Sequence, residues 1–243
     1  MRPSRVTSPS ESQVVGVAIP SAGSGLRMGG RRKAFLTLSG RPLLAHSLRP
    51  FLDHSKVTSV VVALAPADAE NPPAWLRDLD VRVRLVAGGK SRRDSVCAAI
   101  EALASTVTWV LVHDAARPLV TRAIIDRCIG RLGESEGIVA GWPVGDTLKE
   151  VGEGRTVLAT PDRSRLWAAQ TPQGFPKDRL TSAYRRAVAE GFEGTDDAEV
   201  YCRFGGTARI VEGSPWNLKV THPEDLVVAE YLSGHSQVQE GRR

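Results

Sequence analysis

Four cations follow a loop of small residues near the start of the chain, a combination suited to binding phosphate groups. The loop has the sequence SAGSG at positions 21–25, after an apolar run that ends at Pro20. The cations are Arg27, Arg31, Arg32 and Lys33. Glycines let backbone N–H groups approach a bound anion closely, and neighbouring cations neutralise its charge. We therefore interpret residues 20–33 as a loop that binds a nucleotide triphosphate.

Two familiar nucleotide-binding motifs do not fit this segment. A Walker A loop requires Ser or Thr directly after its lysine, but Ala34 follows Lys33. A dinucleotide loop requires G-x-G-x-x-G, and Met28 stands where the third glycine belongs. The acidic ribose partner expected roughly 20 residues further on is also missing, because Asp53 comes too late. A plain glycine-rich turn is the structural alternative.

Two later segments also place chemically active residues directly after a strand. Residues 87–95 (AGGKSRRDS) form a second loop of glycines and cations, which opens a helix that Ser91 caps. Residues 113–118 (HDAARP) place the carboxylate of Asp114 at the end of a strand. Ligands of parallel α/β sheets lie beyond the C-terminal ends of the strands. The three segments are therefore predicted to form one site.

Individual residues of these segments leave their roles open. Asp114 either contacts a metal, a ribose or a substrate, or it caps a turn, and Arg117 either pairs with it or binds phosphate. Ser95 either belongs to the helix start or reads a base with its hydroxyl. His113 and His222 have no partner at metal-ligand or triad spacing, so we interpret both as structural. Because no nucleophile–base pair is visible, the sequence predicts an electrostatic site rather than covalent or hydrolytic catalysis.

The elements that must position these segments alternate between strands and helices. Apolar runs predict strands over 14–19, 58–65, 81–86, 106–112, 135–142, 166–169, 208–211 and 218–220, of which 81–86 has the pattern of an edge strand. Helices are predicted over 43–52, 71–80, 91–103, 121–132, 177–190, 195–201 and 223–232. The alternation implies right-handed βαβ units. The predicted fold class is α/β, a Rossmann-like, mainly parallel sheet flanked by helices.

The pattern changes between residues 143 and 161. Gly145, Gly152 and Gly154 interrupt short polar stretches, which is typical of a β-ribbon with a turn at 152–154. The segment has too little apolar content to be an independent domain. We interpret it as a protruding β-arm that reaches over a partner subunit.

Composition is that of an ordinary globular protein. The chain has 243 residues, 42% hydrophobic and 24% charged, which suits one domain over 14–232. The polar leader (1–13) and the tail (233–243) are predicted to be disordered. No apolar run approaches the ~20 residues of a membrane span, so we expect a cytoplasmic protein without a membrane partner. Cys97, Cys128 and Cys202 are far apart, which indicates reduced packing residues rather than disulfides or a zinc site.

The formal net charge of +5 does not by itself indicate a nucleic-acid partner. The cations are scattered, aromatic residues make up only 5% of the chain, and no basic stripe with interleaved aromatics is visible. An anionic small molecule explains the charge equally well. We therefore expect no nucleic-acid partner.

The segments described above resemble the signatures of the 2-C-methyl-D-erythritol 4-phosphate cytidylyltransferase family, nucleotidylyltransferases with a glycosyltransferase-A-like fold. PSAGSGxRM at 20–28, followed by Lys33, is similar to the family's PAAGxGxRM…K loop. GGxxRxxSV at 88–96 is similar to its second signature, and VHDAARP at 112–118 to its most specific one. Further matches follow in order: DTLK (146–149), DR (162–163), LW (166–167), TPQ (171–173), TD (195–196) and NxKVTxPED (217–225). The resemblance spans residues 14–232.

The resemblance implies transfer of a cytidylyl group from CTP to methylerythritol phosphate, with release of pyrophosphate, in the non-mevalonate isoprenoid pathway. Arg27 and Lys33 would then be catalytic. The residues implied for the nucleotide are Pro20, Ser21, Ala22, Gly23, Gly25, Gly88, Gly89, Ser95, Asp114 and Ala115. Those implied for the polyol phosphate are Arg117, Thr147, Arg163, Thr171 and Lys219. Asp114 would also hold Mg²⁺, and Arg163 would come from the arm of the second subunit of a homodimer.

The sequence departs from the family pattern beside the first loop. The linker between Met28 and Lys33 is one residue shorter than in common members, and the family's Pro-Lys-Gln is replaced by Arg32-Lys33-Ala34. Arg31 or Arg32 is therefore an alternative to Lys33 at the phosphates.

Three alternatives to the implied activity stay open at this point. A ribitol 5-phosphate cytidylyltransferase shares nearly all the motifs. A sugar-1-phosphate nucleotidylyltransferase would use UTP or GTP and would differ in base preference. A non-catalytic nucleotide-binding protein would bind nucleotide without releasing pyrophosphate.

Overall fold

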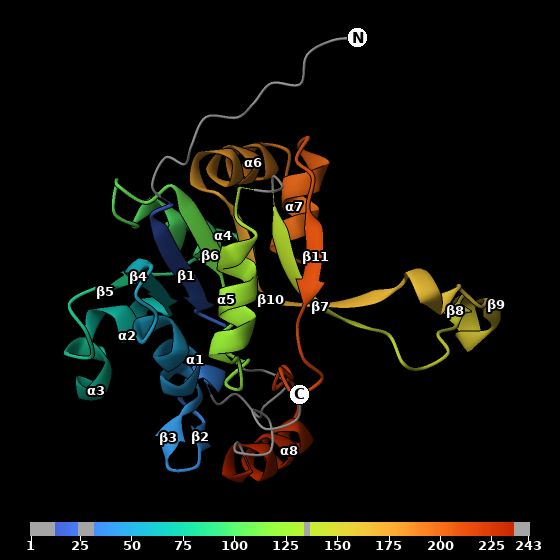
Figure 1. Cartoon of the computed structure of the whole chain (residues 1–243), viewed down its shortest axis with the longest axis horizontal. Helices are drawn as coiled ribbons and strands as arrows, with labels where there is room; N and C mark the ends of the chain where they lie inside the picture. Colours follow the sequence, from blue (N-terminus) through green and yellow to red (C-terminus); the bar gives the residue numbers. More distant parts are fainter. Residues whose placement is uncertain (1–12, 24–31, 134–136, 236–243) are drawn as a thin grey trace.

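A seven-stranded sheet runs through the computed structural model, which describes residues 13–23, 32–133 and 137–235 (Figure 1). In chain order its strands are β1 (Val15–Ser21), β4 (Val57–Leu64), β5 (Val83–Ala87), β6 (Trp109–Val112), β7 (Ile138–Pro143), β10 (Trp167–Pro176) and β11 (Arg209–Glu212). Their order across the sheet is β11-β7-β10-β6-β1-β4-β5. β10 is antiparallel to both of its neighbours, whereas the other paired strands are parallel. The predicted mainly parallel sheet is confirmed.

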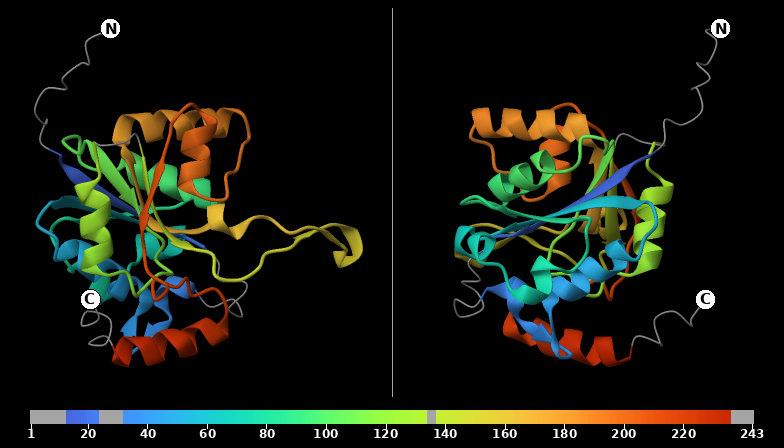
Figure 2. Two further views of the ribbon diagram at one scale, coloured as in Figure 1. Left: turned by 45° about the vertical axis from the view of Figure 1, so that its right-hand side comes forward. Right: turned by 90° about the vertical axis from the view of Figure 1, so that its left-hand side faces the viewer.

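Helices cover both faces of this sheet (Figure 2). One face carries α1 (Leu43–Leu52), α2 (Pro66–Glu70), α3 (Ala74–Arg77) and α5 (Arg122–Gly130). The other carries α4 (Arg92–Glu101), α6 (Lys177–Ala189) and α7 (Asp197–Arg203). The alternation of β1 divides the core between them, because Val17 and Ile19 pack on the first face and Ala18 packs on the second.

A smaller third layer lies at the C-terminal edge of the parallel strands (Figure 1). It consists of the hairpin of β2 (Thr37–Leu38) and β3 (Arg41–Pro42), covered by α8 (Pro223–Gly234). Leu38, Leu43, Val220 and Ala229 form its buried core. The short 3₁₀ turn η2 (Lys33–Phe35) enters this layer from the first loop.

Between β7 and β10 the chain leaves the body and returns as an arm, residues 144–166 (Figures 1 and 2). Its tip is the two-stranded ribbon of β8 (Glu150–Val151) and β9 (Val157–Ala159), joined by η3 (Glu153–Arg155). A further 3₁₀ turn, η4 (Arg163–Arg165), precedes β10. Apolar side chains of the arm are exposed, with Leu158 at 64% and Val157 at 57%. The ribbon and its turn were predicted from the glycines, and the structure confirms them.

Most predicted elements form within two or three residues of their expected ends, and three do not. Residues 218–220 were predicted as a strand, but they form none, because Val220 N–H donates to the Ala116 carbonyl (2.8 Å) of a loop rather than to a strand. The helix predicted over 71–80 is only the single turn α3, and α2 before it was missed. β10 continues to Pro176, well beyond the predicted end at Ala169.

The termini and part of the first loop fall outside the described residues. The disorder predicted for the leader (1–13) and for the tail (233–243) therefore concerns mostly residues that the structure does not describe. α8 extends to Gly234, two residues past its predicted end and into the first residues of that tail. Among the helices that are described, none has the length and apolar composition needed to cross a membrane. The three cysteines are free thiols, as predicted.

Candidate active site

A cavity of about 550 Å³ lies at the C-terminal edge of the sheet, between the ends of β1 and β6 and the start of α4. Its walls are formed by Pro20, Ser21, Ala22, Gly23, Lys33, Ala34, Gly89, Lys90, Ser91, Arg92, Ser95, Asp114, Ala115, Ala116 and Lys219. The three segments expected to share a sheet edge therefore line one cavity. Lys219, from the segment before α8, closes it from another side.

The glycine loop before α4 is held in place by the cap of that helix. Ser91 Oγ accepts from Asp94 N–H (3.1 Å), and Asp94 Oδ2 accepts from Ser91 N–H (3.3 Å). Ser95 Oγ accepts from Gly89 N–H (3.2 Å) and donates to the Ser91 carbonyl (2.9 Å). Ser95 is thus both part of the helix start and part of the cavity wall.

Close packing joins this loop to the first loop. A Cβ built on Gly88 would lie 2.6 Å from Ala22 Cβ and 2.8 Å from Ser95 Oγ. Real side chains do not approach so closely, so only glycine fits between the two loops. Gly88 therefore sets the width of the cavity, although it lies behind the wall.

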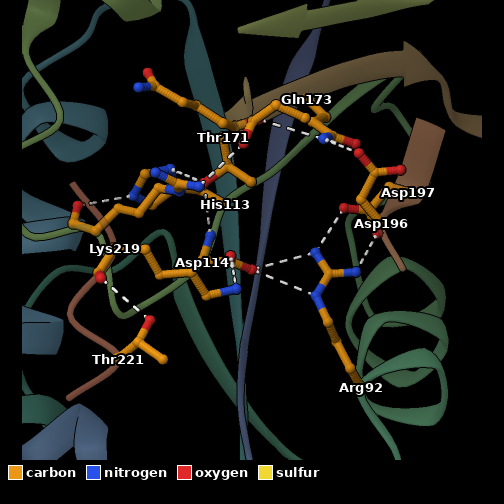
Figure 3. Close-up of polar contacts among 12 residues, drawn as sticks. Arg92, His113, Asp114, Thr171, Gln173, Asp196, Asp197, Lys219 and Thr221 are labelled. Atoms are coloured by element: carbon orange, nitrogen blue, oxygen red, sulfur yellow. Dashed lines mark hydrogen bonds and ion pairs between the residues drawn. The ribbon is translucent and has the colours of Figure 1, made fainter. Parts of the chain in front are cut away.

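Asp114 is the charged centre of the cavity and is only 8% exposed. Lys219 Nζ lies 2.7 Å from Asp114 Oδ2, and Arg92 Nη2 lies 3.2 Å from Asp114 Oδ1 (Figure 3). Burial alone would raise the pKa of the Asp114 carboxyl, but Arg92 and Lys219 outweigh burial and hold its pKa well below the usual range. The carboxylate is therefore ionised at neutral pH.

Arg92 also contacts a second carboxylate, that of Asp197 at the start of α7. Its Nη2 lies 2.7 Å from Asp197 Oδ2 and its Nη1 lies 3.0 Å from Asp197 Oδ1 (Figure 3). Asp197 is fully buried, and the hydroxyl of Tyr184 on α6 donates to it. Burial opposes the charge of Arg92, but Asp197 and Asp114 raise the pKa of its guanidinium further above the usual range.

Hydrogen bonds behind the cavity fix the strand end that carries Asp114. Thr171 Oγ1 accepts from Asp114 N–H (3.0 Å) and contacts His113 Nδ1 (3.0 Å). His113 Nε2 lies 3.2 Å from the Arg117 carbonyl, and burial lowers the pKa of His113 to about 4. A neutral, fully buried histidine without a metal or triad partner agrees with the structural role predicted for His113.

Arg117 and Thr171, both predicted to touch the polyol phosphate, do not line the cavity. The guanidinium of Arg117 is buried and donates to the carbonyls of Asn217 (2.7 Å) and Ala169 (3.2 Å). Arg117 thus ties the loop after β6 to β10 and to the segment that carries Lys219. In this structure both residues support the site from behind.

The described part of the first loop places Lys33 in the cavity wall and Arg32 elsewhere. Arg32 forms an ion pair with Asp68 on α2, whereas Lys33 lines the cavity. Of these two cations, Lys33 is the one positioned for a phosphate. Gly25, Arg27 and Arg31 lie outside the described residues.

Thr147 and Arg163 belong to the arm and lie outside the cavity of their own chain. Both are exposed, and Arg163 donates to the Gly145 carbonyl within the arm. Within a single chain, the cavity wall thus contains Lys219 but neither of these two residues.

The sequence did not single out three charged residues that the structure brings to the site, namely Lys90, Arg92 and Asp197. Arg92 was visible as the fifth position of the GGxxR motif, and Lys90 as a cation beside two glycines. Asp197 lies in the first turn of α7, directly after the capping residue Asp196, where an acid is favourable for the helix itself. The pairing of Arg92 with an acid 105 positions away left no pattern in the sequence.

Comparison with known proteins decides the family. The model of the family described as 2-C-methyl-D-erythritol 4-phosphate cytidylyltransferase matches residues 15–234. The chain belongs to this family. A cytidylyltransferase of that name from Symbiobacterium thermophilum is 45% identical over 219 residues, which cover 90% of this chain and 92% of that protein. One from Aquifex aeolicus is 44% identical over 218 residues, covering 89% and 96%.

Solved structures of cytidylyltransferases have the same fold. The 2-C-methyl-D-erythritol 4-phosphate cytidylyltransferase of Thermus thermophilus superimposes with a TM-score of 0.77 at 35% identity, covering 92% of this chain and all (100%) of that one. The 4-diphosphocytidyl-2C-methyl-D-erythritol synthase of Anaerococcus prevotii gives a TM-score of 0.80 at 26% identity, covering 91% and 99%. Both structures thus share the fold over about nine-tenths of this chain.

The cytidylyltransferase cavity has one carboxylate that is suited to a divalent cation. The described residues contain no group of three or more His, Cys, Asp and Glu side chains placed to hold a metal by themselves. Mg²⁺, however, is commonly held by one or two carboxylates together with substrate phosphates. Asp114, which lines the cavity beside the loop of Gly89 and Lys90, fits that mode of binding.

Proposed function

We propose that the chain transfers the cytidylyl group of CTP to 2-C-methyl-D-erythritol 4-phosphate, giving 4-diphosphocytidyl-2-C-methyl-D-erythritol and pyrophosphate. The observation that carries this proposal is the cavity itself. Two glycine loops, three lysines and one ionised carboxylate converge there from the C-terminal edge of the sheet. Membership of the cytidylyltransferase family supplies the identity of the substrates.

The chemistry needs positioning and charge neutralisation more than acid–base catalysis. An oxygen of the acceptor phosphate attacks the α-phosphorus of CTP, and a new P–O bond forms. The bond from the α-phosphorus to the oxygen that bridges it to the β-phosphorus breaks, and pyrophosphate leaves with that electron pair. Because the attacking oxygen is already anionic, no general base is required. Fixed cations that face the charge on the phosphoryl oxygens therefore lower the barrier.

Each part of the cavity has a distinct role in this scheme. The backbone N–H groups of the first loop and of the loop before α4 would hold the nucleotide. Lys33 would neutralise charge on the triphosphate and stabilise the transition state, together with Arg27. Lys219, whose ammonium group is paired with Asp114 at 2.7 Å, would hold the phosphate of the acceptor.

Mg²⁺ is the proposed cofactor, and Asp114 is the residue that would hold it. When bound with CTP, the cation would supply further positive charge to the phosphates. No other described residue of the cavity is a carboxylate, so phosphate oxygens and water would provide the remaining ligands.

A homodimer in which the arm of one subunit reaches the site of the other is also part of the proposal. The arm extends away from its own body (Figure 1). It exposes Leu158, Val157 and Val151, at 64%, 57% and 55%. Exposed apolar side chains grouped on a protruding ribbon are typical of a protein interface. Thr147 and Arg163 would then complete the acceptor side of the partner's site.

The acceptor is assigned from the family and not from the cavity, because ribitol 5-phosphate also offers a phosphate oxygen and hydroxyl groups. The relatives named above carry the name of the methylerythritol phosphate enzyme, and this favours methylerythritol phosphate over ribitol phosphate.

Pyrophosphate release from CTP and Mg²⁺ tests the proposal, with methylerythritol phosphate and ribitol 5-phosphate measured in parallel. We expect release with methylerythritol phosphate, little with ribitol 5-phosphate, and little when UTP replaces CTP. Preference for ribitol 5-phosphate would change the acceptor but keep the reaction. CTP binding without release from either acceptor would overturn the enzymatic proposal in favour of a nucleotide-binding protein.

A further inference from the structure

Asp197 is a fully buried carboxylate that lies outside the cavity wall, and a single guanidinium separates it from Asp114. Arg92 donates to Asp197 at 2.7 and 3.0 Å and to Asp114 at 3.2 and 3.4 Å (Figure 3). One cation is thus shared by two acids, and it lies closer to the buried acid than to the acid of the site.

We propose that Asp197 is a positioning residue of the active site. By anchoring Arg92, it limits how completely Arg92 neutralises Asp114 and so keeps the Asp114 carboxylate available to the nucleotide and its metal. This inference rests on the proposed function, since it concerns the same cavity.

The surroundings of Asp197 support a fixed anchor. The hydroxyl of Tyr184 donates to Asp197 Oδ1, so both oxygens of this carboxylate are bonded. The start of α7 is held to β10 by Gln173, whose Nε2 donates to Asp196 Oδ2 (2.9 Å) and whose Oε1 accepts from Ala198 N–H (2.9 Å). Asp197 therefore cannot follow Arg92 toward the cavity without breaking these bonds.

The charge balance shows what the anchor prevents. Asp114 and Asp197 carry two negative charges, and Arg92 and Lys219 carry two positive ones. If Asp197 loses its charge, Arg92 keeps only one carboxylate partner among these residues. It would then pair with Asp114 Oδ1 more tightly while Lys219 occupies Oδ2. Both oxygens of Asp114 would be neutralised, which weakens their attraction for a cation.

The central test is the isosteric substitution Asp197→Asn, measured by calorimetric titration of CTP without acceptor, so that no turnover occurs. We expect the dissociation constant of CTP at limiting Mg²⁺ to rise about tenfold, as is common when a residue that supports a metal ligand is changed. Raising the Mg²⁺ concentration should reduce this difference. A dissociation constant unchanged from wild type would overturn the proposal.

A double-mutant cycle with Asp114→Asn tests whether Asp197 acts through Asp114. If it does, adding Asp197→Asn to Asp114→Asn should change the CTP affinity by no more than about twofold. An effect of the same size in both backgrounds would overturn the proposal, because Asp197 would then act on the fold and not on Asp114.

Glu199→Gln is the matched control, because Glu199 lies on the same helix, is exposed, and its carboxylate accepts from Thr195 N–H (2.6 Å) and Thr195 Oγ1 (2.8 Å) rather than from Arg92. It removes the same unit of charge from α7, and we expect it to leave the CTP affinity within about twofold of wild type. Equal weakening of CTP binding by Glu199→Gln and Asp197→Asn would contradict a positioning role.

If Asp197→Asn does not fold, Tyr184→Phe takes its place in the cycle. Removing the phenol hydroxyl loosens Asp197, so we expect a smaller loss of CTP affinity that disappears in the Asp114→Asn background. An unchanged affinity would then overturn the proposal. Because these titrations contain no acceptor, they are independent of whether wild type releases pyrophosphate, and failure of the proposed function is recognised separately.

Discussion

The cavity and the arm differ in how much of their structure the chain itself supports. In and behind the cavity, charged side chains from four different segments of the chain are paired with one another, and Gly88 packs too closely against Ala22 and Ser95 for any larger residue. In the arm, two short strands pair only with each other, and their apolar side chains face outward. A two-stranded ribbon is marginally stable alone in water. The cavity is therefore built within one chain, whereas the arm exposes an apolar surface that we propose a second subunit covers.

Replacing Lys33 has the largest expected effect and tests the first part of this comparison, the cavity built within one chain. Lys33→Ala removes a cation that lines the cavity. By analogy with the loss of one oxyanion-hole donor, we expect kcat/KM to fall about 10²–10³-fold, which corresponds to a loss of ~3–4 kcal/mol in transition-state stabilisation. Steady-state pyrophosphate release measures it, with the exposed Lys56→Ala as a control of equal charge change. A loss smaller than about tenfold would remove Lys33 from the catalytic role.

Mixing two inactive variants tests the second part of this comparison, the proposed action of the arm on a second subunit. If Arg163 acts in the partner's site, dimers that combine Lys33→Ala with Arg163→Ala chains contain one intact site. Random exchange of subunits should then restore about a quarter of wild-type activity, since half of the dimers are mixed and each has one working site of two. No recovery, in a mixture shown to exchange subunits, would mean that Arg163 serves its own chain and that the arm does not complete a partner's site.

Gly88→Ala probes the packing between the two glycine loops, with a smaller expected effect. The new Cβ would lie within 3 Å of Ala22 and Ser95, so the loops must separate. We expect a loss of ~1–3 kcal/mol in CTP binding, as for overpacked cores, measured by calorimetry. Gly130→Ala is the control, because a Cβ there meets nothing within 4 Å. CTP affinity equal to wild type would show that the nucleotide does not depend on this packing.

Acid titration of the melting temperature has the smallest expected effect, and it compares one carboxyl group of the cavity with one of the arm. The pKa of Asp114 is lowered in the folded protein, because Arg92 and Lys219 outweigh burial. As pH falls, the unfolded chain therefore takes up its proton first, near pH 4, and the stability due to Asp114, on the order of 2 kcal/mol, is lost. The melting temperature should thus fall more steeply below about pH 4 in wild type than in Asp114→Asn.

Asp162 in the arm is the control for this titration. Its pKa is lowered mainly by hydrogen bonds from Ser164, and its side chain is exposed. Asp162→Asn should therefore change the slope of melting temperature against pH in the same direction as Asp114→Asn but by much less, because water screens an exposed carboxylate. If the melting temperature of Asp114→Asn depended on pH as steeply as that of wild type, the ion pairs of Asp114 would contribute nothing to the stability of the folded protein.

Local patterns were sufficient to predict most of the fold. Apolar runs gave the strands, Ser91 and Thr121 marked helix starts as predicted, and the alternation of elements placed the loops at one edge. The strand predicted over 218–220 does not form, because an apolar residue can also be buried when it lies in a loop. Val220 lies in the small core beneath α8 without pairing to a strand.

The site was harder to predict because its charges are paired through the tertiary structure. The loops lining the cavity were identified correctly from their glycines and cations. Spacing alone did not reveal that Arg92 reaches Asp197, since their separation in the chain has no periodic signature. The predicted contacts of Arg117 and Thr171 with the polyol phosphate depended on the direction of their side chains. In the structure both side chains bond to segments behind the cavity.

The position of the arm in the chain has an evolutionary consequence. Because β7 and β10 are neighbours and antiparallel, the arm is simply a long hairpin loop between them (Figure 1). The entropy of closing such a loop grows only slowly with its length. Residues can therefore be added to or removed from its tip without shifting the register of either strand, and the strands fix Thr171 behind Asp114. Selection can reshape the arm and whatever surface it binds while the catalytic edge of the sheet stays as it is.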